Sequence, residues 1–422
     1  MKQSKQTRED AVSLPVQSAL IPVFYKKFHC LAQNCKDSCC VNWNITFNKK
    51  DYLKLRRLDV SPELQEKLKN CVRRERNQSH SALDYGKFDL DSNNGRCPFL
   101  DKDGLCSIQR ACGENALPNV CRTYPRNITY TSVAKEFTLS PSCEGVLQQL
   151  WDLPEGIEFV EDPLTTAEYR SVSIPAGENL VLFFEPIRAS CIDILQNREL
   201  TLSQRMLYLG IMLDQLRREE WSTFDPDIWT KRVSSLVNPD KVLELTEENS
   251  RKLFLLQNLN VLKNIAVSEK NWPIEIYKAL ETKLEIMQTK SNSEVTSKLL
   301  STEFSVSAYE DALLSFEAAF SEREYFFENL IVAAALFLKF PKLSSKENLW
   351  KSYMSLCSLY SFYRFVSVLG CKSEPTKERL FYFLVMASRS TLHNRARFNK
   401  FQEELFQHDS STLAHMAILL SN

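Results

Sequence analysis

Apolar residues recur at helical spacing through the second half of the chain, from about residue 186 to the end. A period of three to four residues predicts amphipathic helices that bury one face in a shared core. Glycine is scarce there, with only Gly210 and Gly370 after residue 180, and breaks such as 238–240 separate the stretches. We therefore expect an all-α domain over 186–422, with helices at 195–219, 242–268, 273–290, 308–321, 324–340, 346–369, 377–389 and 395–408.

Residues 19–150 show shorter and more varied patterns. Apolar residues alternate with polar ones at 41, 43, 45 and 47, which is typical of a half-buried strand. Short helices are expected at 49–59, 61–77, 107–115 and 144–150, and an antiparallel pair of strands at 128–133 and 136–140. The pattern thus predicts a domain with short β-strands at 19–150, preceded by a disordered polar tail at 1–18.

Between the two patterned regions, residues 151–185 are rich in proline and glycine and carry an acidic patch. This composition predicts an irregular connection. The expected fold class is therefore mainly α, with a small N-terminal domain followed by an all-α C-terminal domain. The apolar run 330–338 is too short to span a membrane, so we expect it to be a helix buried within the bundle.

The placement of cysteine changes this picture, because ten of the thirteen cysteines fall between residues 30 and 143. Eight of them form three groups: Cys30, Cys35, Cys39 and Cys40; Cys97 and Cys106; Cys121 and Cys143. A chain with 422 residues and 44% hydrophobic composition can bury a core without disulfides, and its polar start is not a signal peptide. In a reducing cytoplasm, grouped cysteines indicate a metal site, whereas isolated ones such as Cys71 and Cys112 suit ordinary burial.

The spacing leaves the metal open between zinc and iron. Zinc sites favour cysteines paired two to four residues apart, whereas iron–sulfur clusters tolerate irregular spacing because each thiolate binds a different iron. The neighbours Cys39 and Cys40 point to opposite faces of an extended segment, so both rarely reach one ion. Eight thiolates are also twice what one four-iron cluster needs. We expect Cys35, Cys39, Cys97 and Cys121 among the ligands, because this choice draws on every group.

A turn lies between the two cysteines of the second group. The segment 100–105 contains Asp103-Gly104, a dipeptide that strongly favours a hairpin turn. We expect this turn to bring Cys97 and Cys106 together across two short arms. The cysteine-rich domain is therefore predicted to collect its thiols through loops and turns.

Charge and motifs exclude several classes of function. The chain carries 53 Lys plus Arg and 53 Asp plus Glu, and it lacks a basic stripe with aromatics, so nucleic acid is not an expected partner. With nine glycines it has no Gly-x-Gly-x-x-Gly, and no P-loop, His-Glu-x-x-His or Gly-x-Ser-x-Gly. The Cys-x-x-x-Cys-x-x-Cys pattern of radical S-adenosylmethionine enzymes begins at Cys35 but fails at Asn42.

Four motifs within residues 25–145 carry a family resemblance. They are Cys30-x4-Cys35-x3-Cys39-Cys40-x2-Trp43-x-Ile45, then Cys97-Pro-Phe-Leu-x4-Leu-Cys106, then Cys121-x3-Pro125-Arg126, and last Ser-x-Ser-Cys143. This arrangement resembles the flagellin lysine N-methylase family, and the helical remainder is similar to it in length and character. The leading group is also similar to the Cys-x-x-x-Cys-Cys iron–sulfur or zinc domain of small bacterial proteins.

The resemblance implies an enzyme that transfers a methyl group from S-adenosylmethionine to lysine side chains of flagellin. It also implies a 4Fe-4S cluster, with zinc as the alternative, held by thiolates drawn from the eight grouped cysteines. Because flagellin would be exported after modification, the implied location is the cytoplasm. No membrane partner is expected.

Methyl transfer to lysine sets chemical requirements for the site. A lysine with a pKa of about 10.4 must first lose its proton, and a sulfonium donor favours aromatic or carboxylate neighbours. We expect Glu328 and Tyr124 as catalytic residues and Trp43, Arg122, Arg126 and Asn329 as cofactor-binding residues. Since ligand sites favour domain interfaces, the expected pocket lies between the two domains.

A non-catalytic function is the alternative. In that interpretation the cysteines fold the first domain around a metal, and the helical domain holds flagellin or another protein without chemistry. Binding of S-adenosylmethionine by the purified protein would separate the two interpretations.

Overall fold

The computed structural model describes residues 12–15, 18–41, 43, 45–75, 84–91, 95–130, 134–163, 171–174, 183–235, 248–265, 272–280, 305–393 and 412–420. The chain divides into two compact units. The helical unit comprises Met1–Lys26, Ile128–Thr138 and Leu150–Asn422, and the cysteine-rich unit comprises Lys27–Asn127 and Leu139–Gln149. The fold is mainly α, as the sequence predicts, and the strands of the described residues all lie within the first 174 residues.

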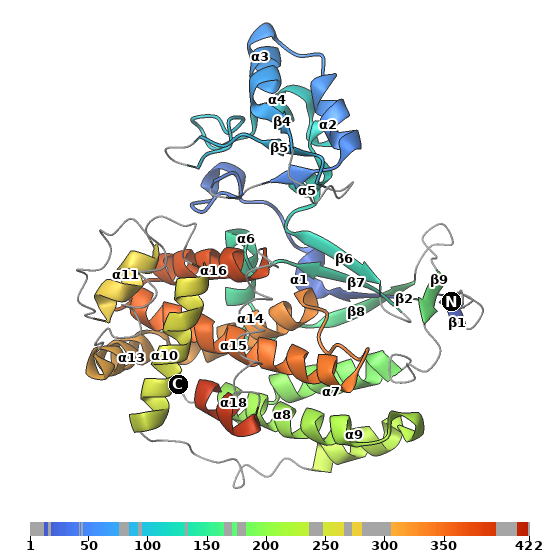
Figure 1. The fold of residues 1–422 in the computed structure, drawn as a ribbon, viewed down its shortest axis with the longest axis vertical. Coiled ribbons are helices and arrows are strands. Elements are labelled where there is room, and N and C mark those ends of the chain that lie inside the picture. Colours follow the sequence, from blue (N-terminus) through green and yellow to red (C-terminus); the bar gives the residue numbers. More distant parts are fainter. Residues whose placement is uncertain are drawn as a thin grey trace, which may run out of the picture. The chain divides into compact units, whose positions relative to one another are not determined.

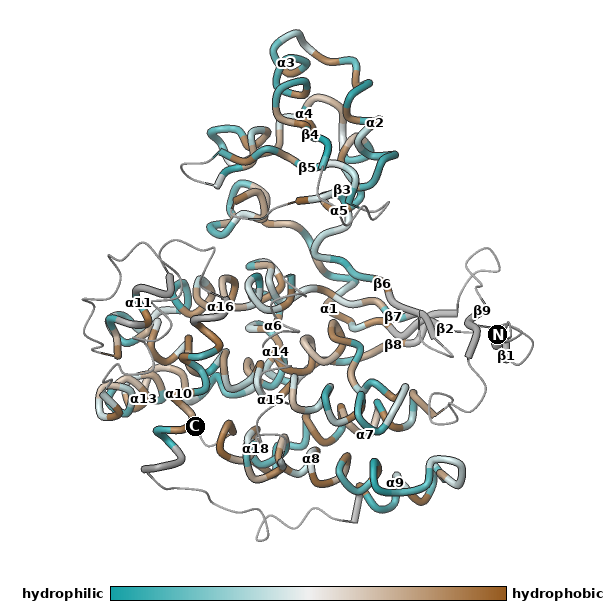
Figure 2. Tube along the Cα trace, viewed as in Figure 1, coloured by the Kyte–Doolittle hydropathy of each residue, from teal (hydrophilic) through white to brown (hydrophobic). Residues whose placement is uncertain are grey.

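The helical unit is a bundle of helices (Figure 1). Its described helices are α1 (Val23–Lys26), α7 (Phe184–Gln196), α8 (Leu202–Arg218), η6 (Trp221–Thr223), α9 (Pro226–Ser235), α10 (Glu248–Ile265), α11 (Trp272–Ala279), α13 (Val306–Phe320), η9 (Ser321–Arg323), α14 (Glu324–Phe337), α15 (Lys346–Gly370), α16 (Lys377–Leu392) and α18 (Leu413–Leu420). Figure 2 shows hydrophobic and hydrophilic residues alternating along α7, α8 and α9, which is the amphipathic pattern read from the sequence.

Helix α15 is the centre of this bundle. It packs against α8, α10, α11, α13, α14, α16 and α18, and it is buried from Ser352 to Gly370. Helix α14 is similarly buried from Phe326 to Leu336, so the expected buried helix at 330–338 is confirmed. A helix that is apolar all round belongs in a core rather than at a surface.

The region expected to be one helix at 195–219 is two helices. Helix α7 ends at Gln196, and α8 begins after Thr201 with a capping box. The Thr201 side chain accepts a hydrogen bond from the Gln204 backbone N–H, and the Gln204 side chain accepts one from the Thr201 backbone N–H. These local bonds satisfy backbone donors that a continuous helix would have paired, which is why the periodicity alone missed the break.

Strands from distant parts of the chain form a sheet in the helical unit. The order is β6 (Arg126–Tyr130), β7 (Ala134–Leu139), β2 (Ser18–Pro22) and β8 (Phe159–Pro163). Strand β2 runs parallel to β7, with Leu20 opposite Glu136, and antiparallel to β8, with Ile21 opposite Val160. A second ribbon pairs β1 (Val12–Pro15) with β9 (Ser171–Ile174).

The cysteine-rich unit combines short helices with a small sheet. Its described elements are η2 (Ala32–Asn34), β3 (Thr46–Phe47), α2 (Lys49–Arg56), α3 (Pro62–Cys71), β4 (Val72–Arg74), β5 (Gly86–Phe88), α4 (Ser107–Cys112), η3 (Glu114–Ala116), α5 (Asn119–Thr123) and the start of α6 (Glu144–Trp151). Its sheet has the order β3-β5-β4. Ser61 caps α3 ahead of Pro62, as the sequence suggests.

Several expected boundaries differ from the structure. Strand β1 lies within the segment expected as a tail and β2 begins at its last residue, Ser18, while residues 1–11 and 16–17 lie outside the described residues. Strands β8 and β9 occupy part of the expected connection at 151–185. The helix expected at 395–408 also lies outside the described residues. The expected division at residue 150 therefore departs from the observed units, because β2 and β7 belong with the helices.

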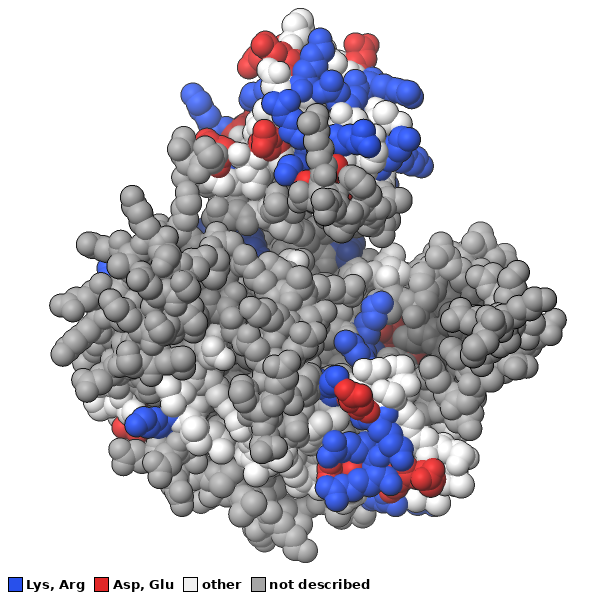
Figure 3. Space-filling model, in the orientation of Figure 1, with Lys and Arg blue, Asp and Glu red and all other residues white. Residues whose placement is uncertain are grey.

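Basic side chains are common on the cysteine-rich unit. Figure 3 shows lysine and arginine spread among fewer carboxylates on its visible face. This matches the modest basic surplus of residues 19–150. Over the described part of the chain, every helix is too short or too polar to cross a bilayer.

Candidate metal centre and its surroundings

Four of the grouped cysteines, one or more from each group, lie together in the cysteine-rich unit. They are Cys40, Cys97, Cys106 and Cys121, which we call the four-thiol set. The Cys97 backbone N–H donates a 2.7 Å hydrogen bond to the Cys40 carbonyl oxygen, and Leu100 forms a β-bridge with Cys106. Cys97 is part of the hydrophobic cluster that includes Phe88, Phe99 and Ile108, and Cys40, Cys106 and Cys121 pack against it, as Cys71 and Cys112 also do. Three distant segments thus bring their thiols to one place.

The predicted hairpin turn explains part of this arrangement. Asp101 N–H donates to the Leu105 carbonyl oxygen at 2.8 Å, and Gly104 closes the turn at φ +78°, a value that suits glycine. The turn predicted from Asp103-Gly104 is therefore confirmed, and it places Cys106 opposite Leu100, three residues after Cys97.

Burial raises the pKa of three of these thiols, and charge on neighbouring thiolates raises it further. Burial raises the pKa of Cys97 to about 12, and negative charge on Cys40 or Cys106 would raise it further. Burial also raises the pKa of Cys106 and, more strongly, that of Cys121, with Cys40 adding to both. Negative charge on Cys40 would thus raise the pKa of each of the other three thiols. A bound cation reverses this balance because it stabilises thiolates, so the donor chemistry fits a thiophilic metal.

The other four grouped cysteines lie elsewhere in the same unit. Cys35 Sγ lies 3.3 Å from Glu144 Oε2, and Cys143 immediately precedes Glu144 at the start of α6. Cys30 Sγ accepts a hydrogen bond from the Ala32 backbone N–H at 3.4 Å. Among the described residues, no three His, Cys, Asp or Glu side chains converge closely enough to hold a metal ion as they lie. The thiols are neighbours rather than a finished coordination sphere.

The structure pairs two of the predicted residues next to the four-thiol set. Trp43 follows Cys40 by three residues and Tyr124 follows Cys121 by three, and their rings meet edge to face at 4.6 Å between centroids. The Tyr124 hydroxyl lies 3.0 Å from Ser142 Oγ. Sequence reasoning named both aromatic residues, but it gave no reason for them to touch.

The two predicted arginines make local contacts. Arg122 is exposed and donates to Asn119 Oδ1 at 3.0 Å. Arg126 donates to the Phe28 carbonyl oxygen at 3.0 Å, and its guanidinium lies over the Phe28 ring. Arg126 therefore anchors the segment that leads into Cys30.

Glu328 and Asn329 lie at the buried start of α14 and bind other parts of the helical unit. Arg198 donates to both Glu328 oxygens, at 2.9 and 3.0 Å, and Arg205 donates to Oε2 at 2.6 Å. Asn329 donates to the carbonyl oxygens of Leu150 and Leu153. The sequence singled out Glu328 but not its two arginine partners, which are more than 120 residues away along the chain. The expected pocket between the domains stays a prediction.

A buried acid–base pair was not anticipated. Glu136 on β7 and Arg188 on α7 are 1% and 2% exposed and lie 3.2 Å apart. Both Glu136 oxygens and both terminal Arg188 nitrogens lack a hydrogen-bond partner among the described residues. Burial raises the pKa of Glu136 from 4.5 to about 7, although the charge of Arg188 opposes this. A lone glutamate in an alternating strand gave no sequence signal of such a pair.

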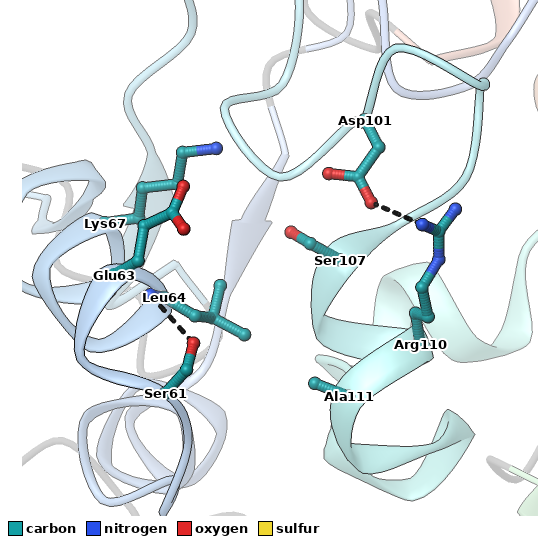
Figure 4. A pocket seen from close by; sticks show the side chains of 8 residues that line it. All are labelled: Ser61, Glu63, Leu64, Lys67, Asp101, Ser107, Arg110 and Ala111. Atoms are coloured by element: carbon teal, nitrogen blue, oxygen red, sulfur yellow. Dashed lines mark hydrogen bonds and ion pairs between the residues drawn. The ribbon is translucent and has the colours of Figure 1, made fainter.

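A pocket of about 290 Å³ lies between α3 and α4 (Figure 4). Its lining residues are Ser61, Glu63, Leu64, Lys67, Asp101, Ser107, Arg110 and Ala111. Figure 4 shows Asp101 paired with Arg110, at 3.5 Å, on the wall opposite Glu63 and Lys67. The catalytic, cofactor-binding and metal-binding residues predicted from the sequence all lie outside this lining, so the pocket is separate from the predicted site.

These features define a class of protein: a cysteine-rich unit joined to a mainly α-helical unit. Comparison with known families gives the same division, because residues 29–144 match a putative zinc- or iron-chelating domain. Residues 188–419, more than half of the chain, match the FliB lysine N-methylase C-terminal domain. The chain belongs to the FliB lysine N-methylase family, as its cysteine motifs predict.

Individual relatives agree with this assignment. The chain is 29% identical to the lysine-N-methylase of Salmonella typhimurium over 168 residues, which are 39% of this chain and 40% of that protein. It is 32% identical to the flagellar biosynthetic protein FliU of Salmonella muenchen over 144 residues, which are 33% of this chain and 80% of that protein. The match therefore spans about two fifths of the lysine-N-methylase. No solved structure is similar to the chain.

Proposed function

We propose that the protein methylates lysine side chains of flagellin, with S-adenosylmethionine as methyl donor. The observation that carries this proposal is the family match over residues 188–419, together with the relatives named lysine-N-methylase and flagellar biosynthetic protein. The proposed location is the cytoplasm, where flagellin would be modified before export. The non-catalytic interaction module finds less support, because the matching relatives are named as methylases.

The proposal includes an iron–sulfur cluster of the 4Fe-4S type, with zinc as the alternative. The match to a zinc- or iron-chelating domain supports a metal, and the four-thiol set supplies four sulfur donors from three segments. When bound, such a centre would replace the repulsion among the thiolates with attraction and fasten those segments together. This fastening would contribute to the folding of the cysteine-rich unit.

The aromatic pair beside the four-thiol set is the proposed place for the donor. A sulfonium cation is attracted to aromatic faces. Trp43 and Tyr124 supply two aromatic rings that contact each other. The donor's carboxylate would bind Arg122 or Arg126, whose guanidinium groups are both near Cys121 in sequence. Tyr124 is the proposed catalytic group, since its hydroxyl can take part in removing the proton from the lysine ammonium.

Glu328 and Asn329 also remain part of the proposal, but their observed contacts change the roles that we assign to them. Both Glu328 oxygens already accept hydrogen bonds from arginines, which favours a positioning role over that of a free base. The Asn329 side-chain amide donates hydrogen bonds to two backbone carbonyl oxygens. Its Oδ1 has no hydrogen-bond partner among the described residues. We propose that this buried oxygen contacts the cofactor.

The test is methyl transfer with purified components. The full chain, purified without oxygen, is incubated with flagellin and S-adenosylmethionine labelled in its methyl group, and tryptic peptides are mapped by mass spectrometry. Label on flagellin lysines is expected, and omission of the protein is the control. Stable binding of flagellin without any labelled lysine would favour the interaction module instead.

A further inference from the structure

We propose that the pocket between α3 and α4 binds a small zwitterion, namely a free α-amino acid with an apolar side chain. Every residue that lines this pocket lies within the cysteine-rich unit. The predicted catalytic, cofactor-binding and metal-binding residues lie outside the lining, so the inference goes beyond the proposed methyl transfer and does not depend on it. It follows from the charges that face the pocket and from how few of them are paired.

The α3 wall of the pocket carries one unpaired charge of each sign. Glu63 and Lys67 are exposed and lie four residues apart on α3, a spacing at which opposite charges often form an ion pair. They do not form that pair, and neither side chain makes a hydrogen bond or an ion pair with another described residue. Figure 4 shows both charged ends directed into the space between the two helices. Both charges are therefore available to a ligand.

The opposite wall, formed by the hairpin turn and α4, carries hydrogen-bond acceptors. One Asp101 oxygen pairs with Arg110 at 3.5 Å, and the same guanidinium also donates to Asp103, so it neutralises Asp101 only in part. Figure 4 shows the other Asp101 oxygen directed toward α3. The Ser107 hydroxyl donates to the Phe99 carbonyl oxygen at 3.0 Å, which leaves its own oxygen able to accept a hydrogen bond. This wall therefore suits a donor such as an ammonium group.

Together these groups favour a ligand that carries both charges. A cation alone would be attracted by Glu63 and Asp101 but repelled by Lys67, and an anion alone would meet the reverse. A zwitterion can place its ammonium group at Asp101 and Ser107 and its carboxylate at Lys67. An α-amino acid carries these two groups on one carbon atom, so it can contact both walls at once.

The remaining lining offers an apolar contact. Leu64 is 8% exposed and belongs to the hydrophobic cluster of the unit, and Ala111 lies on the opposite wall (Figure 4). An apolar side chain placed between these two residues would be removed from water, which favours binding. The cavity volume of about 290 Å³ is small for a ligand site, so the expected ligand is a single amino acid.

Binding of L-leucine tests the class of ligand. The full chain, purified without oxygen and without chelator, is titrated by calorimetry with L-leucine and with two analogues, 4-methylpentanoate and 3-methylbutylamine. The first analogue lacks the amino group and the second lacks the carboxylate. We expect L-leucine to bind and each analogue to bind about fivefold more weakly or worse, because each loses one ion pair. Absence of L-leucine binding, or equal binding of either analogue, would overturn the proposal.

Variants of the two walls locate the site. We expect Glu63→Gln and Lys67→Gln each to weaken L-leucine binding about fivefold, and Ala111→Phe, which fills the pocket, to weaken it further. Glu66→Gln and Lys69→Gln make the same changes at exposed positions of α3 outside the pocket, and they should bind as the natural chain does. Circular dichroism checks that each variant is folded.

Unchanged affinity for L-leucine in folded Glu63→Gln and Lys67→Gln would mean that the amino acid binds elsewhere, which contradicts the assignment of this pocket. These titrations contain no flagellin and no methyl donor. Their outcome is therefore separate from the outcome of the methyl-transfer assay.

Discussion

At the scale of single residues, the most constrained side chain among the predicted ones is Glu328. Its carboxylate is buried and holds Arg205, which is itself buried, and Arg198, which is partly exposed. Removing one partner of a buried ion pair leaves an uncompensated charge, and such losses are large. The residue chosen as catalytic from the sequence is therefore also a structural tie between α14 and the ends of α7 and α8.

Glu328→Gln tests the two roles together. We expect it to lower the free energy of unfolding of the helical unit by about 2–4 kcal/mol, because Arg205 loses its anion. We also expect methyl transfer to fall strongly at a temperature well below the melting point, with iron content unchanged. Thermal unfolding, metal analysis and the transfer assay measure these separately. Glu322→Gln, an exposed carboxylate in the neighbouring η9, is the matched control.

If folded Glu328→Gln transfers methyl groups at the full rate, Glu328 has only the structural role. Loss of iron in that variant would mean that the helical unit supports the metal centre.

Glu136 predicts a pH dependence of stability. A carboxyl whose pKa rises from 4.5 to about 7 on folding binds its proton more tightly in the folded protein. Its stabilising contribution is complete below about pH 4.5 and is lost as the pH rises through about 7, by about 3 kcal/mol in total. Melting temperatures between pH 5 and pH 8 should therefore fall more steeply for the natural chain than for Glu136→Gln. Glu310→Gln, an exposed change on α13, should keep the natural slope, and equal slopes for all three proteins would contradict the assignment.

At the scale of helices and strands, local chemistry decides boundaries that periodicity leaves open. The apolar pattern ran through 195–219, yet Thr201 and Gln204 begin a new helix there. The hairpin at 100–105 was predictable because Asp103-Gly104 is itself turn chemistry. The partners of Glu328 and the division of cysteines between two places were not predictable, because both depend on contacts between segments about 60 to 130 residues apart.

Thr201→Ala measures the capping box at the start of α8. We expect a loss of about 1 kcal/mol in the free energy of unfolding, since the Gln204 backbone N–H loses its acceptor. Thr201→Ser keeps the hydroxyl and should lie close to the natural chain in denaturant unfolding. A Thr201→Ala protein as stable as Thr201→Ser would show that the cap contributes little to this helix.

At the scale of the whole molecule, the two units should differ in their need for metal. The helical unit has an apolar core around α15, whereas the cysteine-rich unit has short elements around a smaller hydrophobic cluster against which several cysteines pack. Binding free energy at a structural metal site is folding free energy, so removal of metal should unfold the cysteine-rich unit first.

Limited proteolysis with and without a chelator tests this difference. We expect the chelator to increase cleavage within residues 27–127 and to leave the fragment from about residue 150 onward resistant. Mass spectrometry of the fragments locates the cuts, and addition of excess zinc or iron should restore protection. Equal loss of resistance throughout the chain would show that the helical unit also depends on metal.

The pairing of β2 with β7 and β8 also orders events during synthesis. Strand β2 leaves the ribosome more than 100 residues before β7, and the cysteine-rich segment emerges between them. At a synthesis rate of about 5–20 residues per second, roughly 5–20 s pass between the synthesis of β2 and that of β7, its first partner strand. All ten N-terminal cysteines except Cys143 are exposed to the cell's metal supply before that sheet can close. Nine cysteines are therefore available for metal binding before the helical core is complete.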